Sequence, residues 1–143
     1  MSVAAQVAQV SPLAAIFERY HVGWETRNPD MIASLHSEDT IFWLHDGSDK
    51  VLGRDALRRH CAGLFAQFDF SSVMGRRLYG EDHWVFEWTM ILSLAEPNGA
   101  SFTARVEMLD VVTVNPLGEV TRKDVYMNGA QSQAAFARAG VDR

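Results

Sequence analysis

Cysteine is scarce in this sequence, which has a single one, Cys61, among 143 residues. One cysteine excludes an internal disulfide framework and suits a reducing compartment, and no CxxC or clustered Cys/His spacing suggests structural zinc. Long apolar runs are also absent, since no segment approaches the ~20 apolar residues needed to span a bilayer. The N-terminus has neither the basic region nor the apolar run of a signal peptide. We therefore expect a cytoplasmic protein that does not interact with a membrane.

Positive charge is in deficit as well. Thirteen Lys and Arg residues stand against 18 Asp and Glu residues, which gives a net charge of -5. There is thus no electrostatic case for nucleic acid or an anionic membrane as a partner, and the ligand should be small or uncharged. A hydrophobic content of 48% with 22% charged residues is ordinary for a soluble globule. We expect one domain over residues 11–143, preceded by a loose tail at residues 1–10, whose side chains are small and weakly patterned.

Three helices are predicted in the first half of the chain. Ser11-Pro12 is an N-cap followed by proline at the first helical position, and apolar residues at helical spacing extend the helix to about Thr26. Asn28-Pro29 repeats this signal, and predicts a short helix from Pro29 to about His36. A third helix follows Gly53-Arg54-Asp55, with Cys61 in its apolar stripe. These three helices precede most of the strand signals.

Strand patterns dominate the rest of the chain. A β-branched and aromatic run over Asp39–His45 predicts one strand, and period-two patterns predict strands over residues 71–78, 84–94, 101–114 and 120–127. Turn residues at Asn115–Gly118 connect the last two. This order predicts an α+β fold with helices on one face of a curved antiparallel sheet. The interior of such a cone is a natural site for a small hydrophobic molecule.

Asp110 is the one acid on the apolar face of the strand that begins at Ser101. Burial among apolar side chains removes hydration and disfavours the charged form, so this acid could stay neutral and donate a hydrogen bond. A partner such as Arg105 or Arg122 could instead neutralise it. Its position favours a role in a pocket.

Several segments together resemble the nuclear-transport-factor-2-like (NTF2-like) superfamily, with its SnoaL-like polyketide-cyclase and ketosteroid-isomerase-like members. The run of residues 17–42 resembles the opening of these proteins, Gly53–Leu57 resembles the start of their third helix, and residues 109–128 are similar to their closing hairpin. The resemblance implies an NTF2-like, cystatin-like cone. In this fold three N-terminal helices pack on a curved, mixed, mostly antiparallel sheet. It also implies a homodimer formed through the outer sheet face.

The same resemblance suggests site residues. In ketosteroid isomerases a tyrosine on the first helix and a protonated aspartic acid on the penultimate strand form an oxyanion hole, and Tyr20 and Asp110 match their places. The aspartate that moves the proton is replaced by Leu44. We therefore assign the proton transfer to His45 or Asp124, so the candidate catalytic residues are Tyr20, Asp110, His45 and Asp124. No cofactor and no metal are expected.

Alternatives remain open for most of these residues. Tyr20 could be a core aromatic, His45 a solvated surface residue, and Asp124 the partner of Arg122 or Lys123 in a surface salt bridge. The side chains expected to contact a ligand are Trp24, Phe42, Trp88, Val106 and Met108.

The sequence therefore predicts a cofactor-independent enzyme for acid/base chemistry. Isomerisation, cyclisation or dehydration of a small hydrophobic carbonyl compound, such as a steroid, polyketide or terpenoid, would fit the predicted pocket. The alternative is a noncatalytic module that binds a small ligand or dimerises.

Overall fold

The computed structural model describes residues 11–141, so the tail expected at residues 1–10 lies outside the described residues. Helix α2 (Pro12–Glu25) begins where the sequence predicts, because the Ser11 side chain accepts a hydrogen bond from Leu13 N at 3.2 Å. Helix α3 (Pro29–Ser34) is capped in the same way by Asn28. It ends before the predicted His36, because that residue already pairs with Val120 in a strand. Helix α4 (Arg54–Gln67) follows Gly53 as predicted.

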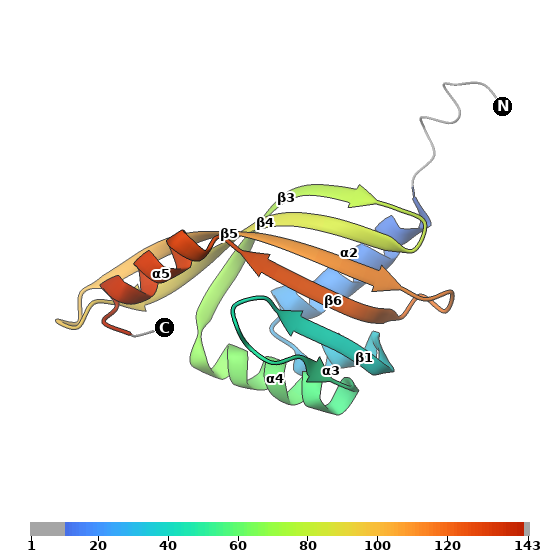
Figure 1. The fold of residues 1–143 in the computed structure, drawn as a ribbon, viewed down its shortest axis with the longest axis horizontal. Helices are drawn as coiled ribbons and strands as arrows, with labels where there is room; N and C mark the ends of the chain where they lie inside the picture. The colour runs from blue at the N-terminus through green and yellow to red at the C-terminus, as the bar shows by residue number, and fades with distance from the viewer. Residues whose placement is uncertain (1–10, 142–143) are drawn as a thin grey trace, which may run out of the picture.

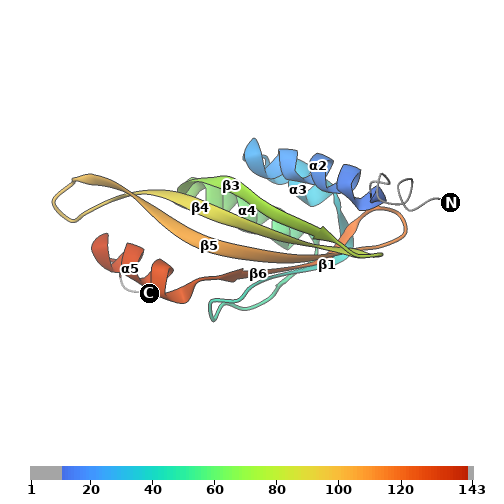
Figure 2. The same cartoon turned by 90° about the horizontal axis from the view of Figure 1, so that it is seen from above.

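Within residues 11–141, six strands form one sheet in the order β2-β1-β6-β5-β4-β3. Their bounds are β1 (His36–Leu44), β2 (Val51–Leu52), β3 (Asp69–Tyr79), β4 (His83–Ala95), β5 (Ser101–Val114) and β6 (Val120–Met127). The pair β1–β6 is parallel and the other pairs are antiparallel. The sheet is therefore mixed and mostly antiparallel, as the resemblance to the NTF2-like superfamily implied (Figures 1 and 2).

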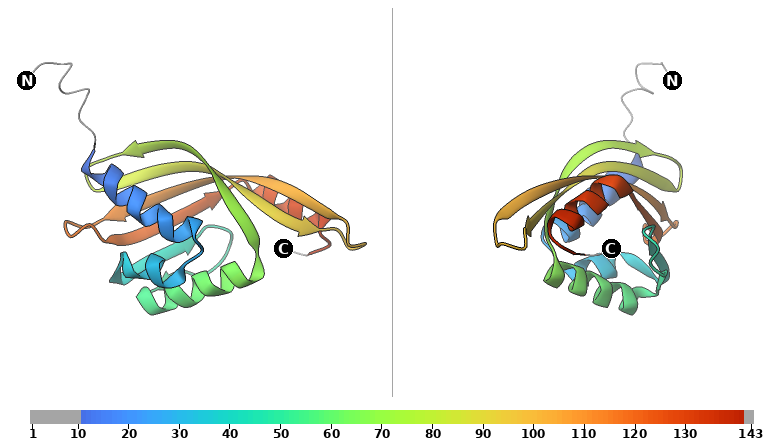
Figure 3. Two further views of the ribbon diagram at one scale, coloured as in Figure 1. Left: turned by 180° about the vertical axis from the view of Figure 1, so that it is seen from behind. Right: turned by 60° about the vertical axis from the view of Figure 1, so that its left-hand side comes forward.

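A fourth helix, α5 (Gly129–Arg138), adds to the three that the sequence predicted. The Asn128 side chain caps it by accepting a hydrogen bond from Gln131 N at 3.1 Å. Figure 3 shows the strands arching over the helices, with α5 at the far end of the arch from α3. Because α5 packs against β5, it closes part of the space under the sheet.

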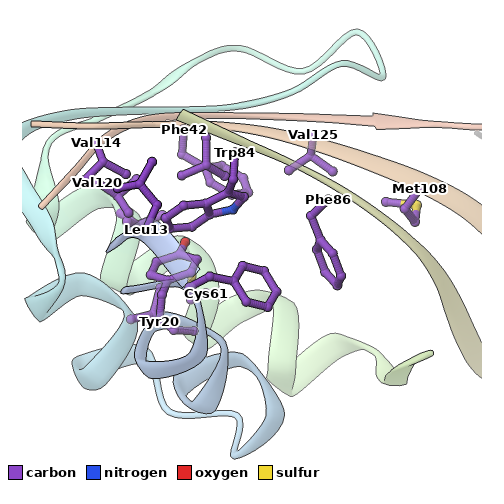
Figure 4. Close-up of a cluster of buried hydrophobic side chains, with 14 of the residues drawn as sticks. Leu13, Tyr20, Phe42, Cys61, Trp84, Phe86, Met108, Val114, Val120 and Val125 are labelled. Atoms are coloured by element: carbon purple, nitrogen blue, oxygen red, sulfur yellow. The ribbon is translucent and has the colours of Figure 1, made fainter. Parts of the chain in front are cut away.

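The hydrophobic core lies between the concave face of the sheet and the helices (Figure 4). Trp84 on β4 is 1% exposed and packs its ring against Phe17 and Tyr20 of α2, with centroid distances of 5.6 and 5.9 Å. Cys61 is fully buried, so its predicted role in packing is confirmed. In residues 11–141, no helix is long and apolar enough to cross a membrane.

Candidate active site

A cavity of about 510 Å³ lies between the concave face of the sheet and the helices α2, α4 and α5. Its wall is largely aromatic and aliphatic, as is usual for sites that bind small apolar molecules. Glu25, Asp46 and Ser71 line the cavity and are also exposed, so the cavity reaches solvent at these residues.

Four of the five side chains expected to contact a ligand line this cavity, namely Trp24, Phe42, Trp88 and Met108. Val106 does not, because its side chain is fully buried in the hydrophobic core. Strand alternation assigned Val106 to the correct face of β5. It could not show that other side chains cover Val106 completely.

Alternation on two neighbouring strands brings a pair of opposite charges to the cavity wall. Asp110 on β5 lies opposite Val125 on β6, and Lys123 lies opposite Val112, so the two charged residues are diagonal neighbours on one face. Lys123 Nζ is 3.4 Å from Asp110 Oδ2, and the two side chains are only 7% and 5% exposed. The cavity therefore contains a buried ion pair.

Asp110 accepts hydrogen bonds in this structure. Trp88 Nε1 donates to its Oδ1 at 2.9 Å, while the Lys123 ammonium faces Oδ2. Both carboxylate oxygens therefore act as acceptors, and the contacts do not give Asp110 the predicted role of a neutral donor. Its charge partner is also neither of the expected arginines but Lys123.

A chain of buried hydrogen bonds fixes the orientation of the Tyr20 hydroxyl. The Thr40 hydroxyl donates to Val120 O at 3.3 Å, so Thr40 Oγ1 accepts from His36 Nδ1, 2.8 Å away. Burial lowers the pKa of His36 to about 3, so the ring is neutral and the lone pair of its Nε2 can accept a hydrogen bond. Tyr20 Oη lies 2.8 Å from this nitrogen and donates to it. The one hydroxyl proton of Tyr20 is thus directed away from the cavity.

Lys123 is the hydrogen-bond donor that faces the cavity. Burial alone would lower its pKa, but interactions with Tyr20 and Asp110 outweigh this effect and raise the pKa, so the ammonium stays charged. Two of its three N–H groups meet Asp110 Oδ2 at 3.4 Å and Tyr20 Oη at 3.5 Å, and the Trp24 ring lies 4.1 Å from Nζ. Within the described chain these are its oxygen partners, which leaves one N–H for a ligand oxygen.

His45 and Asp124 lie on the opposite face of the sheet. Their neighbours Leu44 and Val125 line the cavity, and successive side chains on a strand alternate in direction. On the outer face, His45 Nε2 is 2.9 Å from Asp124 Oδ1, which also interacts with the Arg122 guanidinium. The structure therefore does not place either residue where it could move a proton inside the cavity. The alternative of an Arg122–Asp124 salt bridge is confirmed.

Two histidines of other elements do line the cavity. His21 on α2 places Nε2 3.0 Å from Glu25 Oε1, and burial lowers its pKa. His60 on α4 packs its ring 5.2 Å from that of Phe42, and burial lowers its pKa as well. Neither was singled out from the sequence, because their helical positions do not show which way they face across the fold.

Lys123 could have been found from the sequence. It lies two residues before Val125, an apolar residue of the strand predicted over residues 120–127, so a period of two puts both on the same face. His36 had no comparable signal. Its contact with Tyr20 joins residues 16 positions apart on different elements, which only the tertiary structure brings together.

Comparison with known proteins agrees with this fold. Residues 17–123 match the model of a family described as the SnoaL-like domain. The chain is similar to a solved SnoaL-like polyketide cyclase from Shewanella denitrificans OS-217, with 10% identity, a TM-score of 0.76 and coverage of 89% of this chain and 98% of that one. No curated protein gives a significant match to the sequence.

Two further solved structures are similar. One is a protein from Catenulispora acidiphila DSM 44928 with a ketosteroid isomerase-like fold, in complex with trimethylamine, at 18% identity and a TM-score of 0.74, covering 93% of this chain and 96% of that one. The other is SalBIII, an epoxide hydrolase/cyclase-like enzyme with a role in pyran ring formation in salinomycin, at 19% identity and a TM-score of 0.67, covering 82% and 92%. At these identities the likeness establishes the fold alone.

Proposed function

Because this chain belongs to the SnoaL-like domain family, we propose that it is a cofactor-independent acid/base enzyme that acts on a small apolar carbonyl compound. The observation that carries the proposal is the buried Lys123 ammonium, held by Asp110 and Tyr20 in the wall of a largely apolar cavity of about 510 Å³. A charged donor kept in such surroundings stabilises negative charge on a ligand oxygen more strongly than water does.

We assign to Lys123 the role that the sequence predicted for Tyr20 and Asp110. When a base removes a proton from the carbon next to a carbonyl group, the electron pair moves onto the oxygen and forms an enolate. The free N–H of Lys123 donates to that oxygen, Asp110 keeps the ammonium in place, and Tyr20 supports it from the other side. Isomerisation, cyclisation and dehydration of steroid-, polyketide- or terpenoid-like carbonyl compounds can all begin with this step.

Exchange of the protons next to a ketone carbonyl for deuterium tests the proposal, because it requires only this step. We expect the protein to catalyse the exchange in β-tetralone, a bicyclic apolar ketone, as followed by NMR in D₂O. Lys123→Met should lower the rate by roughly 100- to 1,000-fold, since it removes the donor to the enolate oxygen.

A second variant separates loss of activity from loss of fold. Lys123→Met alone leaves the Asp110 carboxylate buried without its partner, whereas Lys123→Met/Asp110→Asn removes both charges. Both variants should lose the exchange reaction, and the double variant should keep the native circular dichroism spectrum. Wild-type exchange rates in the folded double variant would contradict the role of Lys123.

A noncatalytic receptacle for a small ligand is the second candidate function. It is favoured by Leu44, which lines the cavity where the resemblance to ketosteroid isomerases places an aspartate that moves protons. If the wild-type protein binds β-tetralone without exchanging its protons, this second function replaces the first. Isothermal titration calorimetry beside the exchange assay distinguishes the two.

A further inference from the structure

His60 has a buried nitrogen that faces no hydrogen-bond partner. It lies on α4, lines the cavity, and its Nε2 is buried without an acceptor or donor anywhere in residues 11–141. Most buried polar atoms in proteins are satisfied, because leaving one unpaired removes its hydrogen bonds to water without replacement. An unpaired nitrogen in the wall of a ligand-sized cavity is explained if a bound molecule supplies the partner.

The protonation state of His60 suits a base. Burial lowers its pKa, while the Asp46 carboxylate opposes this shift. The ring is therefore neutral near pH 7, and the tautomer with its proton on Nδ1 presents a lone pair at Nε2. When Nε2 takes up a proton, the nearby negative charge of Asp46 stabilises the imidazolium.

The other acid/base groups around the cavity have charged or hydrogen-bonding partners close by. His21 Nε2 makes no hydrogen bond either, but it lies 3.0 Å from Oε1 of Glu25, whose side chain is 60% exposed. Asp46 accepts hydrogen bonds from the backbone N–H and the hydroxyl of Ser48. Asp110 holds Lys123 and accepts from Trp88.

Aromatic contacts link His60 to the proposed oxygen-binding group. Its ring lies 5.2 Å from that of Phe42, the Phe42 ring stacks 6.3 Å from that of Trp24, and the Trp24 ring lies 4.1 Å from Lys123 Nζ. Lys123 on strand β6 and His60 on helix α4 thus belong to one continuous wall of the cavity. A flat ring system that lies along Trp24 and Phe42 can meet both polar groups.

We propose that His60 is the general base that moves the proton in the SnoaL-like site of this chain. The proposal rests on the proposed function, since it names the residue that works together with Lys123. His60 Nε2 takes a proton from the carbon next to the carbonyl, and the C–H electron pair becomes the carbon–carbon double bond of the enolate. The carbonyl π electrons move to the oxygen, where Lys123 donates a hydrogen bond. Return of a proton from Nε2, to the same or another carbon, restores the neutral ring.

Replacement of His60 by glutamine tests this role, because glutamine is polar and of similar size but is no base at neutral pH. We expect His60→Gln to lower the exchange rate of β-tetralone by roughly 100-fold or more while its dissociation constant stays within about threefold. His83→Gln is the matched control, since His83 lies outside the cavity with a side chain that is 47% exposed. It should exchange β-tetralone at the wild-type rate.

The pH dependence of the exchange rate can be measured on the wild-type protein, so this test does not require that a variant folds. The wild-type exchange rate should rise with pH and level off, with a midpoint below about 6.5. NMR titration of the His60 ring should give the same midpoint, and the rise should be absent in His60→Gln. A His60 titration that differs from the midpoint of the rate profile would overturn the proposal.

Failure of this proposal is distinguishable from failure of the proposed function. If His60→Gln exchanges β-tetralone at the wild-type rate while Lys123→Met does not, His60 is not the base and the enzyme function stands. If the wild-type protein itself shows no exchange, the enzyme function fails, and the assignment of a base fails with it.

Discussion

Lys123 and Asp110 are each buried in a place where a single charge would be unfavourable. Their separation of 3.4 Å compensates part of the lost hydration, and Trp88 and Tyr20 provide further hydrogen bonds. Such a pair contributes little to stability compared with apolar residues of similar size, but breaking it costs roughly 3–5 kcal/mol because the remaining charge stays buried. The pair is therefore better explained by a role in the cavity than by stability.

This reasoning predicts an unusual order of stabilities. Lys123→Met should lower the free energy of unfolding by about 3–5 kcal/mol, because it leaves the Asp110 carboxylate unpaired. Lys123→Met/Asp110→Asn should recover a large part of this loss, although it changes two residues. Urea denaturation monitored by tryptophan fluorescence measures both values. A double variant less stable than the single one would show that the two charges are not coupled.

His36 gives stability a pH dependence. Burial, followed by the charges of Lys123 and Arg54, lowers its pKa from 6.5 to about 3 in the folded protein. At pH values between about 3 and 6.5, His36 binds a proton in the unfolded chain but not in the folded protein. The free energy of unfolding should therefore fall as the pH decreases from about 6.5 towards 3, by up to about 1.4 kcal/mol per pH unit for this residue. Above about pH 6.5 this contribution is constant.

Urea denaturation at a series of pH values measures this slope. His21 and His60, whose pKa values are also lowered by burial, add to it in the same direction. His36→Asn should reduce the slope between about pH 6 and pH 4, whereas His83→Gln, which changes a half-exposed side chain, should leave it as in the wild type. An unchanged slope in His36→Asn would argue against a buried neutral His36.

At the scale of the elements, two helical glycines differ in what surrounds them. Gly23 lies where α2 crosses α3, and a Cβ there would stand 2.9 Å from Ile32 Cγ1. Gly63 lies within α4, and a Cβ there would meet nothing within 4 Å. Close approach of two helices thus requires glycine at Gly23, while Gly63 only weakens its helix.

Alanine at these two positions should have opposite effects. Gly63→Ala should raise the free energy of unfolding by about 0.5–1 kcal/mol, because alanine favours helix. Gly23→Ala should lower it by about 1–3 kcal/mol, since the same gain is outweighed by overpacking against Ile32. Denaturation of both variants tests this expectation, and a change of the same sign in both would show that the α2–α3 contact is not tight.

Helix α5 shows how an element can matter to a site without being predicted. The sequence from Gly129 onwards was not assigned to a helix, although Asn128 is a favourable N-cap. In the structure α5 packs on β5, and its residues Ser132 and Phe136 line the cavity. The predicted fold, with three helices, therefore lacked the part of the cavity wall that α5 provides.

At the scale of the whole molecule, the outer face of the sheet carries exposed apolar side chains. Val73, Leu78 and Tyr126 are 49%, 48% and 43% exposed, and strand pairing places them on the face opposite the cavity. The homodimer expected from the sequence stays a prediction, and this face is where we expect the second copy. Sedimentation velocity should give the mass of a dimer, and Tyr126→Glu should shift it towards the monomer. A monomeric wild type would contradict the prediction.

Much of the fold follows from local signals. The caps at Ser11 and Asn28, the turn at residues 115–118 and the alternation along β4 to β6 each involve neighbours in the chain, so the sequence shows them directly. The candidate site was predicted only in part, because its contacts join residues that are distant in the chain. Alternation placed Asp110 on the concave face, and it would have placed Lys123 there too, but it gave no information about which groups meet.

The sequence by itself determined the order and type of most elements, because hydrophobic periodicity and capping depend on residues within a few positions of each other. Only the tertiary structure decided the chemistry of the site. Hydrogen bonds from Tyr20 to His36 and from Trp88 to Asp110, and the contact of Lys123 with both Tyr20 and Asp110, join residues from different elements. Whether an acid is a donor or an acceptor depends on those distant partners, since they set its hydration and the charge that faces it.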